Sequence, residues 1–153
     1  MFLQLRKMNK IAISTDHAGF YLKENIKDYL IRSGYEVKDF GSFSAESVDY
    51  PDFAHPAVQS VNSGEFDLGI SICGSGNGTN MTANKYQGIR SALCWNEEIS
   101  RLARAHNDAN ICSLPARFIS DAEALLIVKT FLNTKFEGGR HQRRIDKIPL
   151  KRI

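Results

Sequence analysis

The sequence predicts an α/β fold, a Rossmann-like three-layer α/β/α sandwich in which helices cover both faces of a doubly wound parallel sheet. Short apolar, β-branched runs alternate with amphipathic segments from one end of the chain to the other, and polar or glycine-rich loops separate them. Strands joined by helices pair in parallel through right-handed crossovers. The chain has 153 residues and 42% hydrophobic residues, which is enough for one core but too little for two ordinary domains.

The first half of the chain begins with the apolar run KIAIST, which is followed by a segment whose apolar residues recur at helical spacing. Gly34 ends that helix in the position that a C-terminal glycine favours. A second helix begins near Pro51, which is tolerated in a first turn. We expect strands at residues 10–15, 35–41 and 66–73, with helices at 20–34 and from about residue 51 onward.

The second half continues the alternation after the glycine-rich segment GSGNG. Apolar runs again alternate with segments of helical periodicity, and no internal repeat interrupts them. We expect helices at residues 79–86, 97–106 and 121–133, with strands at 89–94 and 109–114.

The ends of the chain differ from this pattern. Met8 directly precedes the first strand, so we expect residues 1–7 to be an N-terminal extension and residues 8–153 to form a single domain. The stretch 136–153 mixes basic and apolar residues after Gly138 and Gly139, and it cannot bury a core by itself. We therefore expect a C-terminal arm that packs on a partner subunit.

Composition excludes several classes of protein. The net charge is +3, and the basic excess lies mostly after Gly139, where Asp146 and apolar residues interrupt it. This favours a small anionic ligand over nucleic acid. The three cysteines form no CxxC pair, which indicates a reducing compartment without structural zinc or disulfides. No run of 18 apolar residues or signal peptide is found, so we expect a cytoplasmic protein without a membrane partner.

The strand-end segment CGSGNG carries the strongest local signal. It places Cys73 at the end of a buried strand and a run of backbone amides directly before a helix, and this combination suits an anion. The helix N-terminus favours the thiolate of Cys73, which could act as base or nucleophile. The alternative is that Cys73 is only a small buried apolar residue. NAD binding is not indicated, because the glycines are evenly spaced and follow a late strand.

Histidines and arginines supply further candidates. Ligands of such sheets bind beyond the carboxyl ends of strands, which selects Asp16 and His17 after the first strand. We expect His106 and Asn107, in RAHNDAN, to lie at the same edge, although surface histidines and capping residues are common. Arginine matches phosphate oxygens bidentately, so a phosphate site is expected, with a solvated basic tail as the alternative. The candidate arginines are Arg117, Arg140 and Arg144.

Six segments in the same order resemble the signatures of type B ribose-5-phosphate isomerases, a family that includes galactose-6-phosphate isomerase subunits and allose-6-phosphate isomerases. The resemblance covers residues 9 to 148. The segments are TDHAG, DYPDFA, ISICGSGNG, ANKYQGIRSALC, RAHNDAN and FEGGRHQRR.

The resemblance implies a reaction and a role for each catalytic residue. Cys73 takes the proton from C2 of the open-chain aldose, and the resulting cis-enediolate is reprotonated at C1. His106 is the acid that opens the furanose ring, and Asp16 handles hydroxyl protons. The hydroxyl of Ser75 and the amides of the loop hold the developing oxyanion. The loop residues are Gly74, Ser75, Gly76, Asn77 and Gly78.

The resemblance also implies how the substrate and the subunits are arranged. Asn107 hydrogen-bonds the sugar, and no metal or organic cofactor is implied. Family members are homodimers, often paired into tetramers, whose active sites are completed by the neighbouring subunit. The implied phosphate ligands are His17, Arg117, Arg140 and Arg144.

Alternatives concern the substrate and the chemistry. Asn77 replaces a usually aliphatic residue and Ile99 a common tyrosine, so a six-carbon substrate, allose or galactose 6-phosphate, stays open. A non-catalytic sugar-phosphate-binding subunit is the second alternative, although such a protein would not need Cys73, Ser75 and His106 together. A nucleic-acid-binding domain is the third, but interleaved aromatic residues are lacking.

Overall fold

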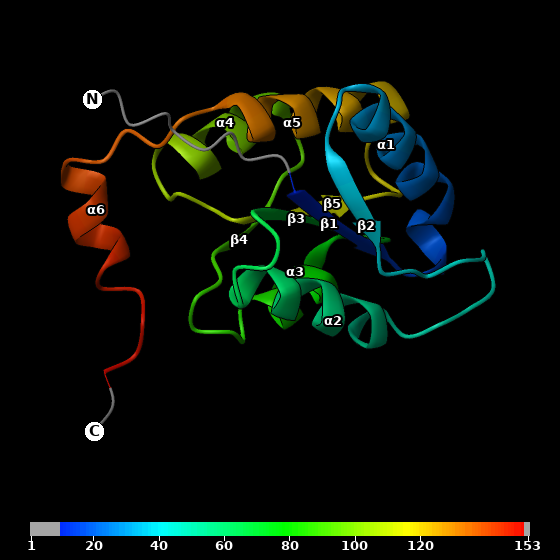
Figure 1. Ribbon diagram of the computed structural model, residues 1–153, viewed down its shortest axis with the longest axis horizontal. Helices are drawn as coiled ribbons and strands as arrows, with labels where there is room; N and C mark the ends of the chain where they lie inside the picture. The colour runs from blue at the N-terminus through cyan, green and yellow to red at the C-terminus, as the bar shows by residue number, and fades with distance from the viewer. Residues whose placement is uncertain (1–9, 152–153) are drawn as a thin grey trace.

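The computed structural model describes residues 10–151, in which five parallel strands form one sheet with the order β2-β1-β3-β5-β4. Helices cover both of its faces (Figure 1). The predicted α/β class is therefore confirmed. The expected extension at residues 1–7 lies outside the described residues, and the single domain 8–153 stays a prediction. The strands are β1 (Lys10–Thr15), β2 (Glu36–Asp39), β3 (Leu68–Cys73), β4 (Ser91–Leu93) and β5 (Ile111–Pro115).

The helices form the two outer layers of the sandwich. On one face lie α1 (Phe20–Arg32), α4 (Glu97–Ala105) and α5 (Asp121–Asn133), and on the other lie α2 (Tyr50–Asn62) and α3 (Asn77–Ala83) (Figure 1). Each layer closes its own apolar core against the sheet. The central strand β3 is buried along its whole length, as expected for a parallel strand covered on both faces.

Element boundaries agree with the sequence to within a few residues. Gly34 has a φ of +88° directly after α1, as its predicted role requires. The 121–133 helix has the predicted limits because Ser120 and Glu123 form a capping box at its start. In contrast, α3 begins at Asn77 rather than residue 79, because the glycine loop passes into the helix without a spacer.

The order of the strands places a topological switch point between β1 and β3. From β1 the chain moves outward to β2, whereas from β3 it moves toward β5 and β4. The connections that leave β1 and β3 therefore enter helices on opposite faces of the sheet, α1 and α3. A crevice for ligands forms at such a point, beyond the carboxyl ends of the two strands.

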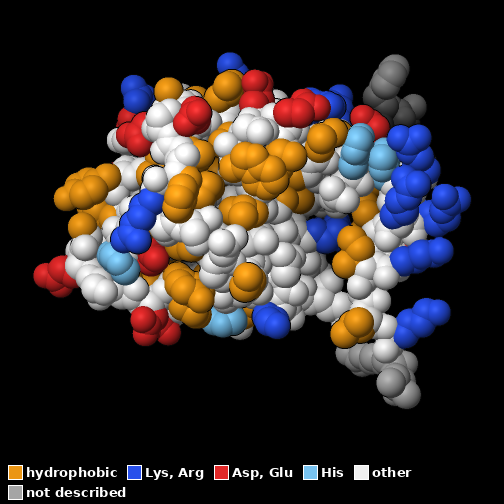
Figure 2. Space-filling view, turned by 180° about the vertical axis from the view of Figure 1, so that it is seen from behind, with side chains coloured by type: hydrophobic (Ala, Val, Ile, Leu, Met, Phe, Trp, Pro, Cys, Tyr) orange, Lys and Arg blue, Asp and Glu red, His pale blue; other side chains and the backbone are white. Residues whose placement is uncertain are grey.

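The C-terminal segment lies at the opposite side of the molecule. After α5 the chain passes α4 and forms α6 (Arg140–Ile145), which lies beyond the amino ends of the strands (Figure 1). Lys and Arg side chains gather along this segment (Figure 2). Within residues 10–151, no helix has the length and apolar character needed to cross a bilayer.

Candidate functional site

Cys73 is the last residue of β3 and stands at the switch point. It pairs in register with Pro115 of β5, and its carbonyl accepts a hydrogen bond from the Ala116 amide at 3.0 Å. Only 4% of Cys73 is exposed. The neighbouring strands thus fix the backbone of Cys73 within the sheet. The loop that follows Cys73 leaves the sheet.

The loop after Cys73 depends on glycine at Gly76, whose φ is +74°. A Cβ at that position would lie 2.4 Å from Leu93 Cδ1 and 3.1 Å from the Leu114 carbonyl carbon. Arg117 lies against the same loop, because its amide donates to the Gly74 carbonyl at 3.0 Å. Its guanidinium Nη1 is 3.2 Å from where a Gly74 Cβ would stand. The structure therefore brings the predicted thiol, loop and arginine together.

Asp16 and His17 leave β1 beside this loop. The Asp16 amide donates to the Ile72 carbonyl at 3.2 Å, and its carboxylate accepts from the Ala18 amide at 2.9 Å. Asp16 is 6% exposed. His17 Nδ1 is 3.2 Å from the carbonyl oxygen of Val48. The carboxyl ends of β1 and β3 thus hold an acid, an imidazole and a thiol as neighbours.

Tyr50 is a residue of this edge to which sequence reasoning assigned no role. It begins α2, and a Cβ on Gly78 would lie only 2.4 Å from its ring. The ring therefore packs directly on α3, next to the glycine loop. Only its inclusion in the DYPDFA segment could have indicated it, because Tyr50 is far from Cys73 in sequence and follows no strand.

Buried hydroxyl groups connect the strands to α3 beneath the loop. Ser14 and Ser71 are paired on β1 and β3, with 3.1 Å between their Oγ atoms. Ser71 is also hydrogen-bonded to Thr79 of α3. All three residues are at most 2% exposed. This chain of hydroxyls fixes where α3 starts, and so where the loop lies.

His106 and Asn107 do not lie at the edge that the sequence led us to expect. They follow α4 and precede β5, so they lie at the amino ends of the strands. The Asn107 carbonyl accepts a hydrogen bond at 2.9 Å from Arg90, which precedes β4. The expectation of a shared edge was wrong, because a helix returns antiparallel to its strands and delivers its last residue to the opposite edge.

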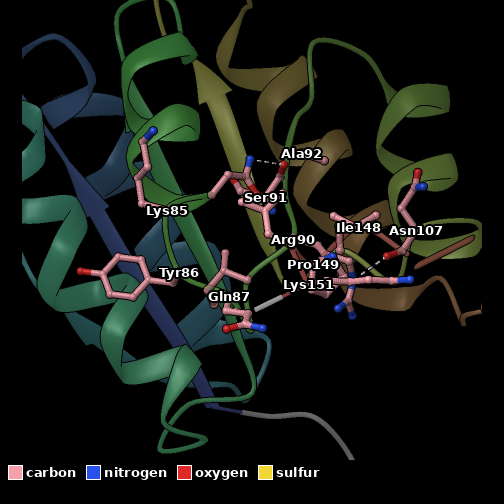
Figure 3. Close-up of a pocket in the computed structure, with 14 residues that line it drawn as sticks. Lys85, Tyr86, Gln87, Arg90, Ser91, Ala92, Asn107, Ile148, Pro149 and Lys151 are labelled. Carbon is pink, nitrogen blue, oxygen red and sulfur yellow. Dashed lines mark hydrogen bonds between the residues drawn. The ribbon is translucent and has the colours of Figure 1, made fainter. Parts of the chain in front are cut away.

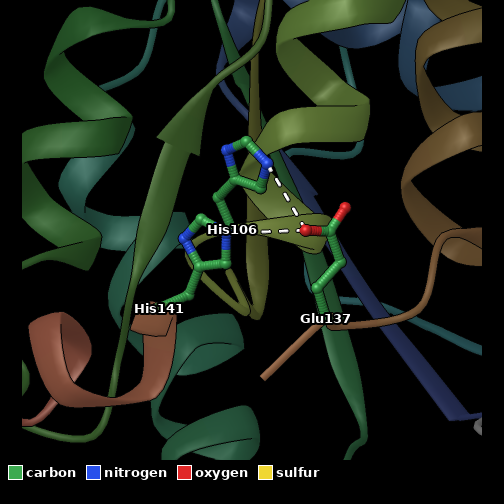
Figure 4. A group of neighbouring side chains, drawn as sticks. All are labelled: His106, Glu137 and His141. Carbon is green, nitrogen blue, oxygen red and sulfur yellow. Dashed lines mark ion pairs between the residues drawn. The ribbon is translucent and has the colours of Figure 1, made fainter. Parts of the chain in front are cut away.

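His106 belongs instead to a cluster with Glu137 and His141 (Figure 4). The two imidazole rings stack with centroids 4.2 Å apart and an interplanar angle of 11°. His141, to which the sequence analysis assigned no role, is 7% exposed and packs on His106. Burial, followed by the charges of His106 and Arg140, lowers the pKa of His141.

A buried arginine holds the loop that carries this cluster. Arg104 Nη1 donates to the Ala109 carbonyl at 2.6 Å and to the Asp108 carboxylate at 3.1 Å. Burial lowers the pKa of Arg104 in spite of the neighbouring Asp108 carboxylate. Asp108 has a φ of +45°, so the turn after His106 is held in a conformation that few residues adopt freely.

Arg140 and Arg144 both lie on α6, one helical turn apart and exposed. Between the C-terminal segment and the body lies a pocket of about 690 Å³ (Figure 3). It is lined by residues 84–87 and 89–92, by Asn107 and Ala109, and by residues 148–151. Cys73 does not line it. The candidate residues therefore form two groups at opposite edges of the sheet.

The fold and the first group define an α/β protein whose strand-end crevice holds a buried cysteine, an acid and a glycine loop at the switch point. The family described as Ribose/Galactose Isomerase matches residues 11–148, and the chain belongs to that family.

Relatives with known names agree over nearly the whole chain. Ribose-5-phosphate isomerase B of Escherichia coli is 43% identical over 141 residues, which cover 92% of this chain and 95% of that protein. The crystal structure of a ribose 5-phosphate isomerase from Thermotoga maritima is 56% identical, with a TM-score of 0.90 over 92% of this chain and 97% of that one.

A third relative was solved with a sugar phosphate. The structure of ribose-5-phosphate isomerase B from Mycoplasma genitalium contains bound ribulose-5-phosphate. It is 45% identical, with a TM-score of 0.87, and the match covers 91% of this chain and 93% of that chain.

Proposed function

We propose that this protein is an aldose-ketose isomerase that interconverts ribose 5-phosphate and ribulose 5-phosphate in the pentose phosphate pathway. The observation that carries the proposal is the thiol of Cys73 at the switch point, beside Asp16 and the glycine loop. The family membership and the relative with bound ribulose-5-phosphate support the substrate. Free thiols at all three cysteines accord with a reducing, cytoplasmic compartment.

Proton transfer between C1 and C2 is assigned to Cys73. As a thiolate it removes the proton from C2 of the open-chain aldose, and the cis-enediolate is reprotonated at C1. Amides of the loop from Gly74 to Gly78 face the developing oxyanion, and the Ser75 hydroxyl adds a donor. Asp16, fixed by the Ala18 amide, exchanges protons with the substrate hydroxyls.

The phosphate is assigned to His17 and Arg117 from this edge. Arg117 offers a planar fork against the Gly74 backbone, and His17 lies at the end of β1. A dianionic phosphate needs more positive charge than this pair supplies, and Arg140 and Arg144 are the candidates. They lie on α6, beyond the other edge of the sheet (Figure 1).

The active site is therefore proposed to combine two copies of the chain, with the carboxyl edge of one subunit facing the amino edge of another. The second copy would supply His106 as the ring-opening acid, Asn107 as a hydrogen-bond partner of the sugar, and the two arginines. The C-terminal arm would pack on the neighbouring subunit, because its Ile148 and Leu150 are 58% and 90% exposed. A homodimer, alone or paired into a tetramer, satisfies this arrangement.

The test of the function is turnover of ribose 5-phosphate by the native protein and by Cys73→Ala, without added metal. We expect the native protein to isomerise the pentose, and Cys73→Ala to lose at least about a hundredfold in kcat. Cys94→Ala is the matched control, because Cys94 is equally buried but follows β4 rather than β3.

Allose and galactose 6-phosphates are assayed in parallel. Preferential turnover of either hexose phosphate would show that the substrate is a six-carbon sugar phosphate. The chemistry assigned to Cys73 would be unchanged. Absence of turnover with every sugar phosphate, together with retained binding, would instead identify a binding subunit. Full activity of Cys73→Ala would exclude Cys73 as the base.

A further inference from the structure

We propose that Glu137 and His141 are positioning residues for His106: the Glu137 carboxylate orients the His106 imidazole for ring opening, and His141 holds its ring plane by stacking. This inference rests on the proposed function, because it deepens the role of His106 in that reaction. No role was assigned to Glu137 or His141 from the sequence.

The geometry places one carboxylate oxygen against both rings (Figure 4). Glu137 Oε2 lies 3.7 Å from His106 Nε2 and 3.5 Å from His141 Nε2. The Glu137 amide donates to the Ala105 carbonyl at 3.0 Å, so the backbone of this segment is attached to the end of α4. This backbone hydrogen bond fixes Glu137 next to His106, whatever contacts the Glu137 carboxylate itself makes.

The two histidines differ in exposure, and this decides which of them can meet a substrate. The His106 side chain is 36% exposed and that of His141 is 9% exposed. The two rings stack with centroids 4.2 Å apart, so the buried His141 ring supports one face of the more accessible His106 ring. The backbone of His106 is fixed as well, because its amide donates to the Leu102 carbonyl at the end of α4.

Other charges near this group either are already paired or act on His141. Glu98 of α4 also faces His106, but its carboxylate accepts bonds from Arg101 at 2.7 and 3.0 Å. Burial, followed by the charges of His106, Arg140 and Arg144, lowers the pKa of His141. Glu137 is thus the carboxylate placed to orient the His106 ring.

A shared metal ion is the competing explanation, since the ligand atoms of the three side chains lie within 4.8 Å of one another. A metal bonds an imidazole along a nitrogen lone pair, which lies in the plane of the ring. Rings that stack within 11° of parallel cannot both direct a lone pair at one ion. The arrangement therefore disfavours a metal ion shared by the two rings.

The experiment compares Glu137→Gln with the native protein on two substrates. Ribose 5-phosphate must be opened, whereas 4-deoxyribose 5-phosphate lacks the hydroxyl that closes the furanose ring. We expect Glu137→Gln to lower kcat on ribose 5-phosphate about tenfold with KM nearly unchanged, and to leave the acyclic substrate unaffected. Glu98→Gln, which removes a carboxylate already paired with Arg101, should match the native protein on both substrates.

Two further readouts separate positioning from a structural role. Glu137→Gln should unfold at the same denaturant concentration as the native protein, because the Glu137 side chain is 52% exposed and the bond from its amide to Ala105 remains. His141→Phe, which keeps a flat ring, should retain more activity than His141→Ala.

Each result decides between the possibilities. Unchanged kcat of Glu137→Gln on ribose 5-phosphate overturns the inference, and so does an equal loss on both substrates. Activity that chelators abolish and Zn²⁺ restores would also overturn it in favour of a metal. Absence of turnover of both substrates by the native protein would overturn the proposed function itself, whereas an active native protein and an equally active Glu137→Gln variant would overturn only this inference.

Discussion

The two edges of the sheet are built in different ways. At the carboxyl edge, Cys73 and Asp16 directly continue β3 and β1, and the ladders of the sheet fix their backbones. At the amino edge, His106 follows a helix and is held by Arg104 and by the segment that contains Glu137. Rigid strands position the first group, whereas loop contacts and a C-terminal segment position the second.

This difference shows which site residues can be placed from sequence alone: those that directly follow a parallel strand. Residues directly after parallel strands gather at one edge whatever the rest of the chain does. Residues after helices gather at the other edge, and their position depends on side-chain contacts. The two groups can serve one reaction only if the carboxyl edge of one copy meets the amino edge of another. This requirement can be tested.

The largest expected effect comes from mixing two inactive variants. Cys73→Ala and His106→Asn should each lose at least about a hundredfold alone. If each site takes Cys73 from one copy and His106 from another, the population refolded from equal amounts should recover about a quarter of native activity, because about half of its dimers are mixed and each mixed dimer has one intact site of two. The measurement is kcat per subunit before and after subunit exchange. Lack of recovery in verified mixed dimers would mean that the two edges do not share a site.

The next effect concerns the backbone at the carboxyl edge. Gly76→Ala puts a Cβ 2.4 Å from Leu93 Cδ1 at a φ of +74°, so we expect a loss of about 3 kcal/mol in unfolding free energy. The matched control is Gly64→Ala, where φ is +82° but nothing lies within 4 Å. It should cost only about 1 kcal/mol. Denaturant titration at one protein concentration measures both, and equal losses would contradict the steric argument.

At the amino edge, the comparable effect is the loss of Arg104. Arg104→Met leaves the buried Ala109 carbonyl without its donor and removes the shorter of two arginine contacts to the Asp108 carboxylate, and we expect a loss of about 3 kcal/mol. The 101–110 region should also lose protection from hydrogen exchange. Arg101→Met, at an exposed position of the same helix, should change stability little. Similar stability of the two variants would show that Arg104 does not hold this loop.

A smaller effect, with a defined pH dependence, is expected at Asp39, at the end of β2. Burial would raise the pKa of its carboxyl, but hydrogen bonds from Lys23 and Lys27, at 2.6 and 2.8 Å, outweigh this and lower it. The stabilisation is present at neutral pH and disappears as pH falls through the lowered folded pKa. Asp39→Asn should thus cost about 1 kcal/mol at pH 7 and almost nothing near pH 2.

Denaturant titration at both pH values checks this prediction. Asp28→Asn removes a carboxylate that is 61% exposed and paired with Arg32 on the same helix, and it should change stability little at either pH. A loss in Asp39→Asn that is equal at both pH values would show that the charge of Asp39 is not its source.

Much of the carboxyl edge could be predicted because local patterns specify it. The apolar run of β3, the evenly spaced glycines and the strand-end rule together identified Cys73, its loop and Asp16. Tyr50 was missed because it meets Gly78 through packing between α2 and α3, and neither segment signals that contact. Glu137 and His141 were missed because the stack with His106 joins segments with no common periodicity.

The sequence by itself determined the α/β alternation, the thiol at the end of a buried strand and the basic character of the C-terminal segment, because these depend on residue type and short-range spacing. Only the tertiary structure decided that His106, Asn107 and the arginines of α6 lie opposite Cys73. The physical reason is directional: in a parallel sheet every helix runs back against the strands, so the residues after a strand and the residues after a helix lie at opposite edges.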